Sequence, residues 1–486
     1  MRKIVLVALT LLFAGGNSKA QFTPLAPTAL NGLPGLAGCA AADPQVPASG
    51  QGPFGGQGLA PYGNGQEPLP RFAGENGPQN VLTFDLNDGT GYDDHVYGTN
   101  TSTYGDFFTD VGARLGFFAT RKHLTVSLDY TPSFYIYKRV SSADNLNQLL
   151  QFDAALEVSR RFQMRVREGG TEYYYGMFGT SPQVVPGLGP PGGAISSSIN
   201  PRTRTITDTS RVDLIFTKSQ RTVIDFFGVY NVLIFSGAYS NLEAATGGLS
   251  YSYSASRRGA FSATYTFSNS LFTAPTSSGT SLVNTQGGSR FVTQTLTLSY
   301  AYQIFKTTSV SLFGGPEQTH VRETLVESIS LPPLGVIPVP VPIDRLEWDW
   351  SAGGGLMTTT HNTTISLSGT RAISNGGGLL TAVNSDFGSL ALGRRLPHSW
   401  QGSMTLSYGL SQALAPGGLP SSSFNTEIGQ AWLSHQLGEH LSVALQYQHQ
   451  RQRLSGGTLG VGDLDRNIGT LRFDWNFKQI AVGPHR

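Results

Sequence analysis

The stretch Leu249–Ser268, "LSYSYSASRRGAFSATYTFS", repeats every two residues on both sides of a short Arg-Arg-Gly turn. Before the turn, Tyr251 and Tyr253 alternate with serines, and after it Tyr265 and Phe267 alternate with threonine and serine. Successive side chains of a β-strand point to opposite faces of the sheet, so a period of two marks a strand whose faces differ. The stretch predicts a β-hairpin with one apolar face and one face rich in hydroxyl groups.

The same alternation recurs along the chain after residue 78. The stretches that show it share Leu, Val, Ile, Met or Tyr on one face and Ser, Thr or Gln on the other, and they cover residues 124–130, 295–302, 364–368, 403–408 and 441–448. Helical spacing of apolar residues does not occur over comparable lengths. The pattern predicts an all-β fold.

Composition indicates which solvent surrounds this fold. Only 13% of the 486 residues are charged, and the net charge is +2, whereas a water-soluble protein carries about 25% charged residues. A soluble β-sandwich or propeller would present charges on its outer face, but the second face here is Ser, Thr, Gln and Asn. Apolar-out and polar-in alternation is typical of a transmembrane β-barrel. No apolar run after the N-terminus reaches the roughly 18 residues of a membrane-spanning helix.

Turn positions predict the number of strands. Short connections, which alternate with longer ones, occur at 119–123, 159–162, 217–221, 256–259, 305–308, 360–363, 393–398 and 436–440. If each joins two strands there are sixteen, and one more at each end, near 81–86 and 469–477, gives eighteen. The sequence thus predicts a transmembrane antiparallel up-and-down β-barrel of 16 to 18 strands, about 18, with both termini on the periplasmic side.

With these patterns the chain resembles bacterial outer-membrane β-barrel proteins of the porin type over residues 79–478. The end of the pattern, with Leu471, Phe473, Trp475 and Phe477 on one face, resembles their C-terminal assembly signal, although nine residues follow Phe477. The resemblance implies location in the outer membrane of a diderm (Gram-negative) bacterium, with outer-membrane lipids and the outer-membrane assembly machinery as partners. It also implies a homo-oligomer as an expectation, since proteins of this type and size often form trimers.

The N-terminus predicts export. Arg2 and Lys3 precede an apolar run at 4–14, and the small residues around Ala20 suit signal-peptide cleavage before Gln21. We therefore expect a signal peptide at 1–20, a flexible Pro/Gly-rich periplasmic segment at 21–77, the barrel at 78–478 and a C-terminal tail at 479–486.

The single cysteine, Cys39, follows Leu-Ala-Gly as in the lipobox of bacterial lipoproteins. In lipoproteins that motif abuts the apolar run, whereas about twenty residues intervene here, so we do not expect lipidation. One cysteine excludes a disulfide within the chain. The expected roles of 21–77 are a spacer or, as an alternative, an arm that contacts the cell wall or partly fills the lumen.

Strand parity gives a set of candidate lumen-lining charges. They carry both signs and are Asp129, Asp153, Glu157, Arg165, Arg167, Arg211, Asp213, Glu347, Asp349, Arg472 and Asp474. Rings of one sign would predict ion selectivity, whereas this mixture predicts ion pairs that brace the wall or weak selectivity. A register error of one residue would invert the assignment for a strand.

Two long connections stand out. The region 169–210 is a candidate constriction loop or a mobile surface loop, and its candidate residues are Tyr173, Tyr174, Tyr175, Arg202 and Arg204. The proline-rich stretch 328–345 is expected not to join a β-ladder, and either to pack on its own barrel, to cover the mouth or to contact another protein. Arginine pairs in the short turns mark the ends of the span or lie near lipid phosphates.

The function predicted from the sequence is transport. The nine histidines are scattered and no metal, nucleophile or phosphate-binding signature occurs, so we expect no enzymatic activity, no cofactor and no nucleic-acid partner. Sixteen to eighteen strands enclose more space than their side chains fill, which predicts a channel for small polar solutes or secreted material. The alternatives are an exopolysaccharide export barrel and a plugged structural or adhesive surface barrel.

Overall fold

The computed structural model describes residues 80–97, 104–174, 204–236, 241–273, 289–331, 335–374, 383–414, 423–455, 464–477 and 480–481. The predicted signal peptide, the 21–77 segment, Cys39 and most of the predicted C-terminal tail lie outside these ranges. Within them, no helix is long and apolar enough to cross a membrane.

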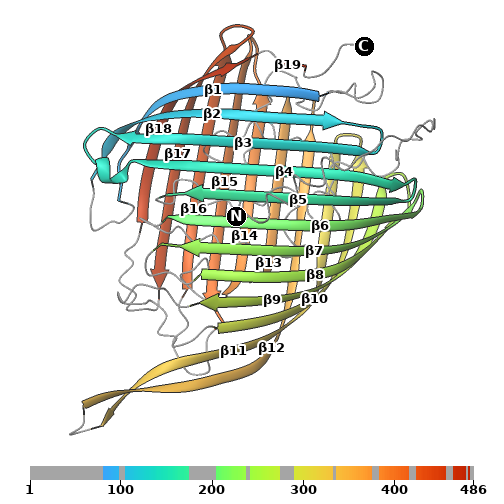
Figure 1. Cartoon of the computed structure of the whole chain (residues 1–486), viewed down its shortest axis with the longest axis vertical. Coiled ribbons are helices and arrows are strands. Elements are labelled where there is room, and N and C mark those ends of the chain that lie inside the picture. Colours follow the sequence, from blue (N-terminus) through green and yellow to red (C-terminus); the bar gives the residue numbers. More distant parts are fainter. Residues whose placement is uncertain are drawn as a thin grey trace, which may run out of the picture.

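The described chain forms a closed antiparallel β-barrel (Figure 1). Its strands are β1 (Asn80–Asp93), β2 (Asp106–Thr120), β3 (Leu124–Tyr137), β4 (Asn145–Ser159), β5 (Phe162–Tyr173), β6 (Thr205–Ser219), β7 (Thr222–Phe235), β8 (Asn241–Ser254), β9 (Gly259–Thr273), β10 (Ser289–Phe305), β11 (Thr308–Leu331), β12 (Gly335–Thr359), β13 (Thr363–Ser374), β14 (Val383–Arg395), β15 (Trp400–Ala413), β16 (Ser423–Gln436), β17 (Leu441–Ser455) and β18 (Leu464–Asn476). Each strand pairs with its neighbours in sequence, and β1 pairs with both β2 and β18, which closes the barrel. The predicted fold class and the eighteen long strands are confirmed.

The eight predicted short connections are the eight tight turns of one end of the barrel, here called the turn end, and the longer connections lie at the other, the loop end. The chain returns to the wall after β18, because β19 (Ile480–Ala481) pairs with Val81 and Leu82 at the start of β1. At the same end Phe84 packs against Phe477, with ring centroids 5.3 Å apart.

The two faces of the wall differ as the sequence pattern predicts. On the outer face Phe261 and Leu298 are 52% and 59% exposed, whereas Thr264 on the inner face is 2% exposed. Inner hydroxyls satisfy one another across neighbouring strands, as in the pair Ser250 and Thr264 at 3.0 Å and the pair Ser385 and Ser411 at 3.0 Å. The inner face therefore forms a polar lining in which some hydroxyl groups bond across neighbouring strands, and the outer face is a belt of exposed apolar side chains.

The prediction that the proline-rich stretch 328–345 cannot join a ladder is wrong. β11 and β12 have 24 and 25 residues and pair as far as Leu331 with Gly335, so they form a long hairpin that projects from the barrel (Figure 1). The ladder between β12 and β13 covers only Ala352 to Thr359 of β12. The prolines of this stretch occupy alternate positions, at Pro338, Pro340 and Pro342. Their N atoms, which carry no hydrogen, therefore face the edge of β12 away from β11, and the N–H groups of the residues between them pair with β11.

Gly315 of β11 marks the closest approach between two strands. A Cβ atom at this position would lie 1.7 Å from the carbonyl oxygen of Leu296 in β10. The ladder between β10 and β11 is also interrupted at Gly315 and Pro316, between the pairs Thr295–Glu317 and Leu298–Gly314. Only glycine fits here, because the obstacle is backbone.

We therefore expect Gly315→Val to destabilise the barrel by about 1–3 kcal/mol, the usual range for overpacking. The matched control is Gly247→Ala, since a Cβ at Gly247 meets nothing within 4 Å. Denaturant unfolding of both variants in lipid vesicles measures the difference. Equal stability of the two variants would contradict this assignment.

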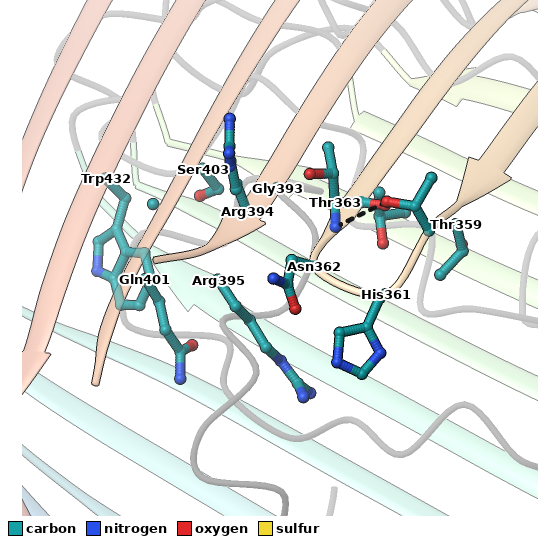
Figure 2. A pocket seen from close by; sticks show the side chains of 13 residues that line it. Thr359, His361, Asn362, Thr363, Gly393, Arg394, Arg395, Gln401, Ser403 and Trp432 are labelled. Atoms are coloured by element: carbon teal, nitrogen blue, oxygen red, sulfur yellow. Dashed lines mark hydrogen bonds between the residues drawn. The ribbon is translucent and has the colours of Figure 1, made fainter. Parts of the chain in front are cut away.

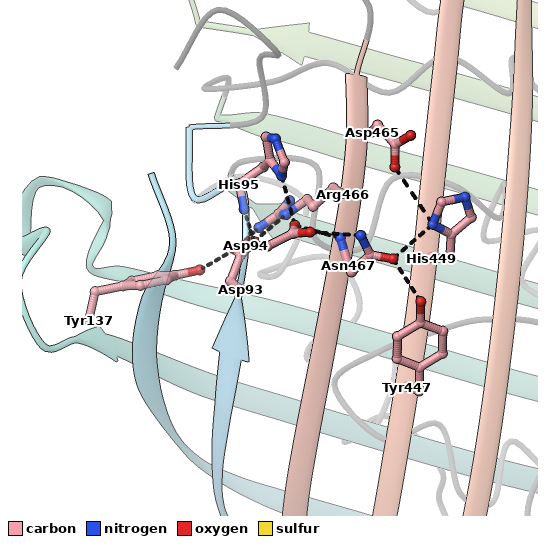
Figure 3. A network of polar contacts seen from close by, with 9 residues as sticks. All are labelled: Asp93, Asp94, His95, Tyr137, Tyr447, His449, Asp465, Arg466 and Asn467. Carbon is pink, nitrogen blue, oxygen red and sulfur yellow. Dashed lines mark hydrogen bonds and ion pairs between the residues drawn. The ribbon is translucent and has the colours of Figure 1, made fainter. Parts of the chain in front are cut away.

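The seam between the first and last strands is closed by a buried polar network (Figure 3). The Arg466 guanidinium is 1% exposed and donates from Nε to Asp93 Oδ1 at 3.0 Å, while its NH2 group bonds the other oxygen of Asp93. The Tyr137 hydroxyl lies 3.3 Å from the same carboxylate and donates to it. Three strands, β1, β3 and β18, therefore meet at one ion pair between residues 373 positions apart in sequence.

Next to this ion pair, Asn467 donates its backbone and side-chain N–H groups to Asp94, each at 2.7 Å. Burial raises the pKa of Asp94, but these hydrogen bonds, together with His95, outweigh it and hold the pKa below its ordinary value. Such a carboxylate stabilises the fold above its unfolded-state pKa and loses that contribution as the pH falls through the lower folded-state pKa. Asp94 thus strengthens the seam at neutral pH.

Candidate solute pathway

The inner wall near β2 to β5 carries two bidentate ion pairs. Arg114 Nε lies 3.0 and 2.9 Å from the two carboxylate oxygens of Asp129, and Arg165 Nε lies 3.0 Å from both oxygens of Asp153. All four side chains are 12–29% exposed. Each pair joins two neighbouring strands, so both charges brace the wall while they remain accessible from the lumen.

A second group of charged side chains, which are more fully buried, lies on β5, β6 and β7. Arg167 NH2 and Arg211 Nε each lie 2.6 Å from a different oxygen of Asp213, and Arg211 NH2 lies 3.7 Å from Asp225. All four side chains are at most 4% exposed. The Arg211 guanidinium also stacks 4.7 Å from the centre of the Phe227 ring. The group contains two cations and two anions, so its formal charge is zero.

The remaining predicted lumen residues are distributed around the wall. Arg472 Nε donates to Asp474 at 2.6 Å next to the seam, and Glu347 pairs with Arg345 at 3.1 Å on β12. Asp349 accepts a hydrogen bond from Asn384. Glu157 is exposed near the turn end of β4. The structure thus brings together Arg165 with Asp153, Arg167 and Arg211 with Asp213, and Arg472 with Asp474. Asp129, Glu347 and Asp349 contact residues outside the predicted set.

Parity also identifies residues that the sequence analysis missed. Arg114 and Asp225 share the parity of the inner face on β2 and β7, and each lies beside a predicted residue. Glu317 of β11 is 4% exposed and accepts the backbone N–H of Ile373 in β13 at 3.3 Å, across the point where β12 leaves β13. The parity signal was present for Arg114 and Asp225, but nothing in the sequence showed that β12 leaves the wall.

Two apolar clusters lie toward the loop end. The first contains Phe108, Tyr135, Tyr137 and Ile468, with Tyr173 packed against it. The second is built from side chains of β8 to β11 and consists of Leu242, Ala244, Phe272, Phe291 and Val321. Apolar side chains therefore join the polar groups of the inner face at two places toward the loop end, which alternation alone did not predict.

The chain at the end of β15 reaches this second cluster. Leu414 packs against it, and the Leu414 carbonyl oxygen accepts a hydrogen bond from Arg345 of β12 at 2.7 Å. In the wall β13 and β14 lie between β12 and β15. The backbone at Leu414 therefore turns away from its own strand neighbours and narrows the loop end of the barrel.

The predicted constriction residues divide between the two faces. Tyr173 is on the inner side, where it contacts the first apolar cluster. Arg204 pairs with Glu172 at 2.7 Å, and its guanidinium lies 5.8 Å from the centre of the Tyr174 ring; Arg204 and Glu172 share the outer-face parity of Val166 and Val212. Tyr175 and Arg202 lie outside the described residues.

A hollow opens near the turn end, lined by the turn between β12 and β13 and by parts of β14, β15 and β16 (Figure 2). Its lining includes His361, Asn362, Arg395, Gln401 and Trp432. Figure 2 shows the Trp432 ring at one side with Gln401 beside it, and Arg395, Asn362 and His361 toward the other side. A cation, amide donors and an aromatic face in one place suit contact with a polar solute.

Among the described residues, no group of three or more His, Cys, Asp or Glu side chains is placed to hold a metal ion. The pathway described by these residues consists of a hollow at the turn end, paired charges along β2 to β7, and a narrower apolar section at the loop end.

Comparison with known proteins gives similarity to solved structures. No family model and no curated protein sequence matches the chain. Similar structures include OccAB4 of Acinetobacter baumannii, with 10% identity, a TM-score of 0.41 and 83% of this chain covered against 98% of that one. OccK2 (OpdF) of Pseudomonas aeruginosa shows 8% identity, a TM-score of 0.42 and coverage of 82% and 98%. The ferric-catecholate import receptor Fiu of E. coli shows 8% identity, a TM-score of 0.42 and coverage of 81% of both chains.

Proposed function

We propose that this chain is an outer-membrane channel that passes small polar solutes. The observation that carries the proposal is the closed wall of eighteen strands with an apolar outer belt and an inner face of hydroxyls and paired charges. Such a barrel is wider than its inner side chains fill, so water and solutes enter it unless a segment plugs it. The predicted signal peptide supports export, with the turn end in the periplasm and the loop end outside.

The inner charges support passage of neutral or weakly charged solutes. Arg114, Arg165 and Arg167 each have a carboxylate partner within hydrogen-bond distance, so neither sign dominates along this part of the wall. The apolar cluster with Leu414 narrows the loop end, which favours small solutes over a polymer such as an exopolysaccharide. We expect a potassium-to-chloride permeability ratio within about threefold of unity.

Single-channel conductance in planar bilayers tests this proposal. The mature chain is compared with a variant that lacks residues 21–77 and with one in which residues 176–202 are replaced by a short Gly/Ser linker. These bounds leave the pairing of Tyr173 with Thr205 intact. A larger deletion, such as one of residues 171–207, would remove paired residues of β5 and β6.

Steady openings of the mature chain are the expected result, and larger openings with the linker would assign the constriction to that loop. Openings only after removal of 21–77 would make that segment a plug, in a gated channel. Silence of all three proteins, with heat-modifiable electrophoretic mobility as proof of folding, would overturn the channel and leave the structural or adhesive barrel.

A further inference from the structure

One sector of the outer face departs from the apolar belt. Glu168 of β5 hydrogen-bonds Asp208 and Ser210 of β6, and all three have outer-face parity. Beside them Gln148 of β4 donates to Glu172 at 3.4 Å and accepts from Tyr130 at 2.8 Å. We call Gln148, Glu168, Glu172, Asp208 and Ser210 the outer polar patch.

Exposed apolar side chains surround this patch. Leu150, Val212, Tyr230 and Ile234 are 39%, 39%, 46% and 43% exposed, and they lie on the same face of β4, β6 and β7. Ile234 lies further toward the loop end than Asp208, since it pairs with Ile206 while Asp208 pairs with Val232. The patch is thus within the apolar belt and not beyond its edge.

The depth of Glu168 leads to the same conclusion. It is the seventh residue of β5, counted from Phe162 at the turn end, and about 9–11 tilted residues span a membrane. A carboxyl group at that depth would face hydrocarbon if lipid covered it. Hydrocarbon offers no hydrogen-bond partner, so charged side chains on a lipid face destabilise a barrel.

The sector on the far side of β7 shows that the chain can build a lipid face without such groups. The outer side chains of β8 and β9 in the opening hairpin, among them Tyr251, Tyr253, Phe261 and Phe267, are apolar or aromatic and 38–52% exposed. The outer face of β8 and β9 is therefore suited to contact with lipid, whereas the outer polar patch is not.

We propose that the outer polar patch on β4, β5 and β6 is an interface within the membrane between two copies of this chain. Two copies inserted in the same direction and related by a two-fold axis along the membrane normal place each patch against its own counterpart at equal depth. A hydrogen bond between two carboxyl groups uses the proton that one of them holds, so the remaining carboxyl oxygens of Glu168 and Asp208 are acceptors. The side-chain amide of Gln148 has a second N–H besides the one it donates to Glu172, so it offers a donor to the acceptors of a second copy.

This inference is independent of the proposed function, because a single barrel is a complete channel. Cross-linking in intact membranes tests it, in a Cys39→Ser background so that each variant holds one cysteine. Val212→Cys reports on the patch, and Leu390→Cys on β14, across the barrel and of similar exposure, is the matched control.

Oxidation is expected to give a dimer band with Val212→Cys and none with Leu390→Cys. Adding Glu168→Leu and Asp208→Leu to Val212→Cys is expected to lower the dimer band at least about fivefold, because both hydrogen-bonding groups are lost. The conservative pair Glu168→Gln and Asp208→Asn keeps hydrogen-bonding groups and is expected to restore most of the band. Heat-modifiable mobility shows that each variant is folded.

Equal cross-linking at the two sectors, or a dimer band unchanged by the leucine substitutions, would overturn the interface. A monomer that retains bound lipid in native mass spectrometry would overturn it as well and would assign the patch to a lipid. If a monomer shows channel openings, the proposed function holds and the interface is wrong. If a dimer forms but shows no openings, the interface holds and the proposed function is wrong.

Discussion

Replacement of Arg466 by methionine is expected to lower the free energy of unfolding by about 3–5 kcal/mol. Arg466 is 1% exposed and Asp93 is fully buried, so the substitution leaves the Asp93 carboxylate buried without a cation, with the Tyr137 hydroxyl at 3.3 Å and the His95 backbone N–H at 3.1 Å as neutral donors. The lost ion pair is at the seam, where β1 can pair with β18 only after the strands between them have formed the wall. We therefore expect closure of the barrel to suffer more than pairing elsewhere in the wall.

Denaturant unfolding in lipid vesicles measures this loss, and the temperature at which electrophoretic mobility changes gives a second measure. The control is the double variant Arg466→Met with Asp93→Leu, which removes both charges. It is expected to recover most of the stability, because no unpaired charge remains. If Arg466→Met alone unfolds like the unmodified chain, the ion pair does not hold the seam.

The barrel itself could be predicted from local pattern. Residues such as Tyr251 and Ser252 point to opposite faces because of the geometry of the strand alone. The number of tight turns then gives the number of strands. The prolines of β12 show the limit of such reasoning. A proline excludes a strand only if its N atom faces a partner, and whether β12 has a partner on both edges depends on where β13 ends.

The candidate site was predictable to a similar extent. Parity placed Asp153, Arg165 and Asp213 on one face, but which charge pairs with which depends on register across strands. The seam network joins residues 373 positions apart, and the contact of Leu414 with the cluster on β8 to β11 reaches past β12, β13 and β14. No local pattern encodes such contacts, because they arise only when the sheet closes.

The second large effect is expected at Arg211. This arginine serves both Asp213 and Asp225, and all three side chains are at most 4% exposed. Arg211→Met leaves two buried carboxylates with Arg167 as the remaining cation of the group, and the formal charge falls from zero to minus one. We expect a loss of about 3–5 kcal/mol in the free energy of unfolding, the range for breaking a buried ion pair.

The same substitution is expected to shift the channel toward cations, because an uncompensated carboxylate on the inner wall attracts them. The reversal potential in a potassium chloride gradient measures this shift. The double variant Arg211→Met with Asp225→Leu restores a neutral group, so it is expected to recover both stability and the original reversal potential. A stability loss with an unchanged reversal potential would mean that the group braces the wall without facing the solute, because the lumen would then not sense its charge.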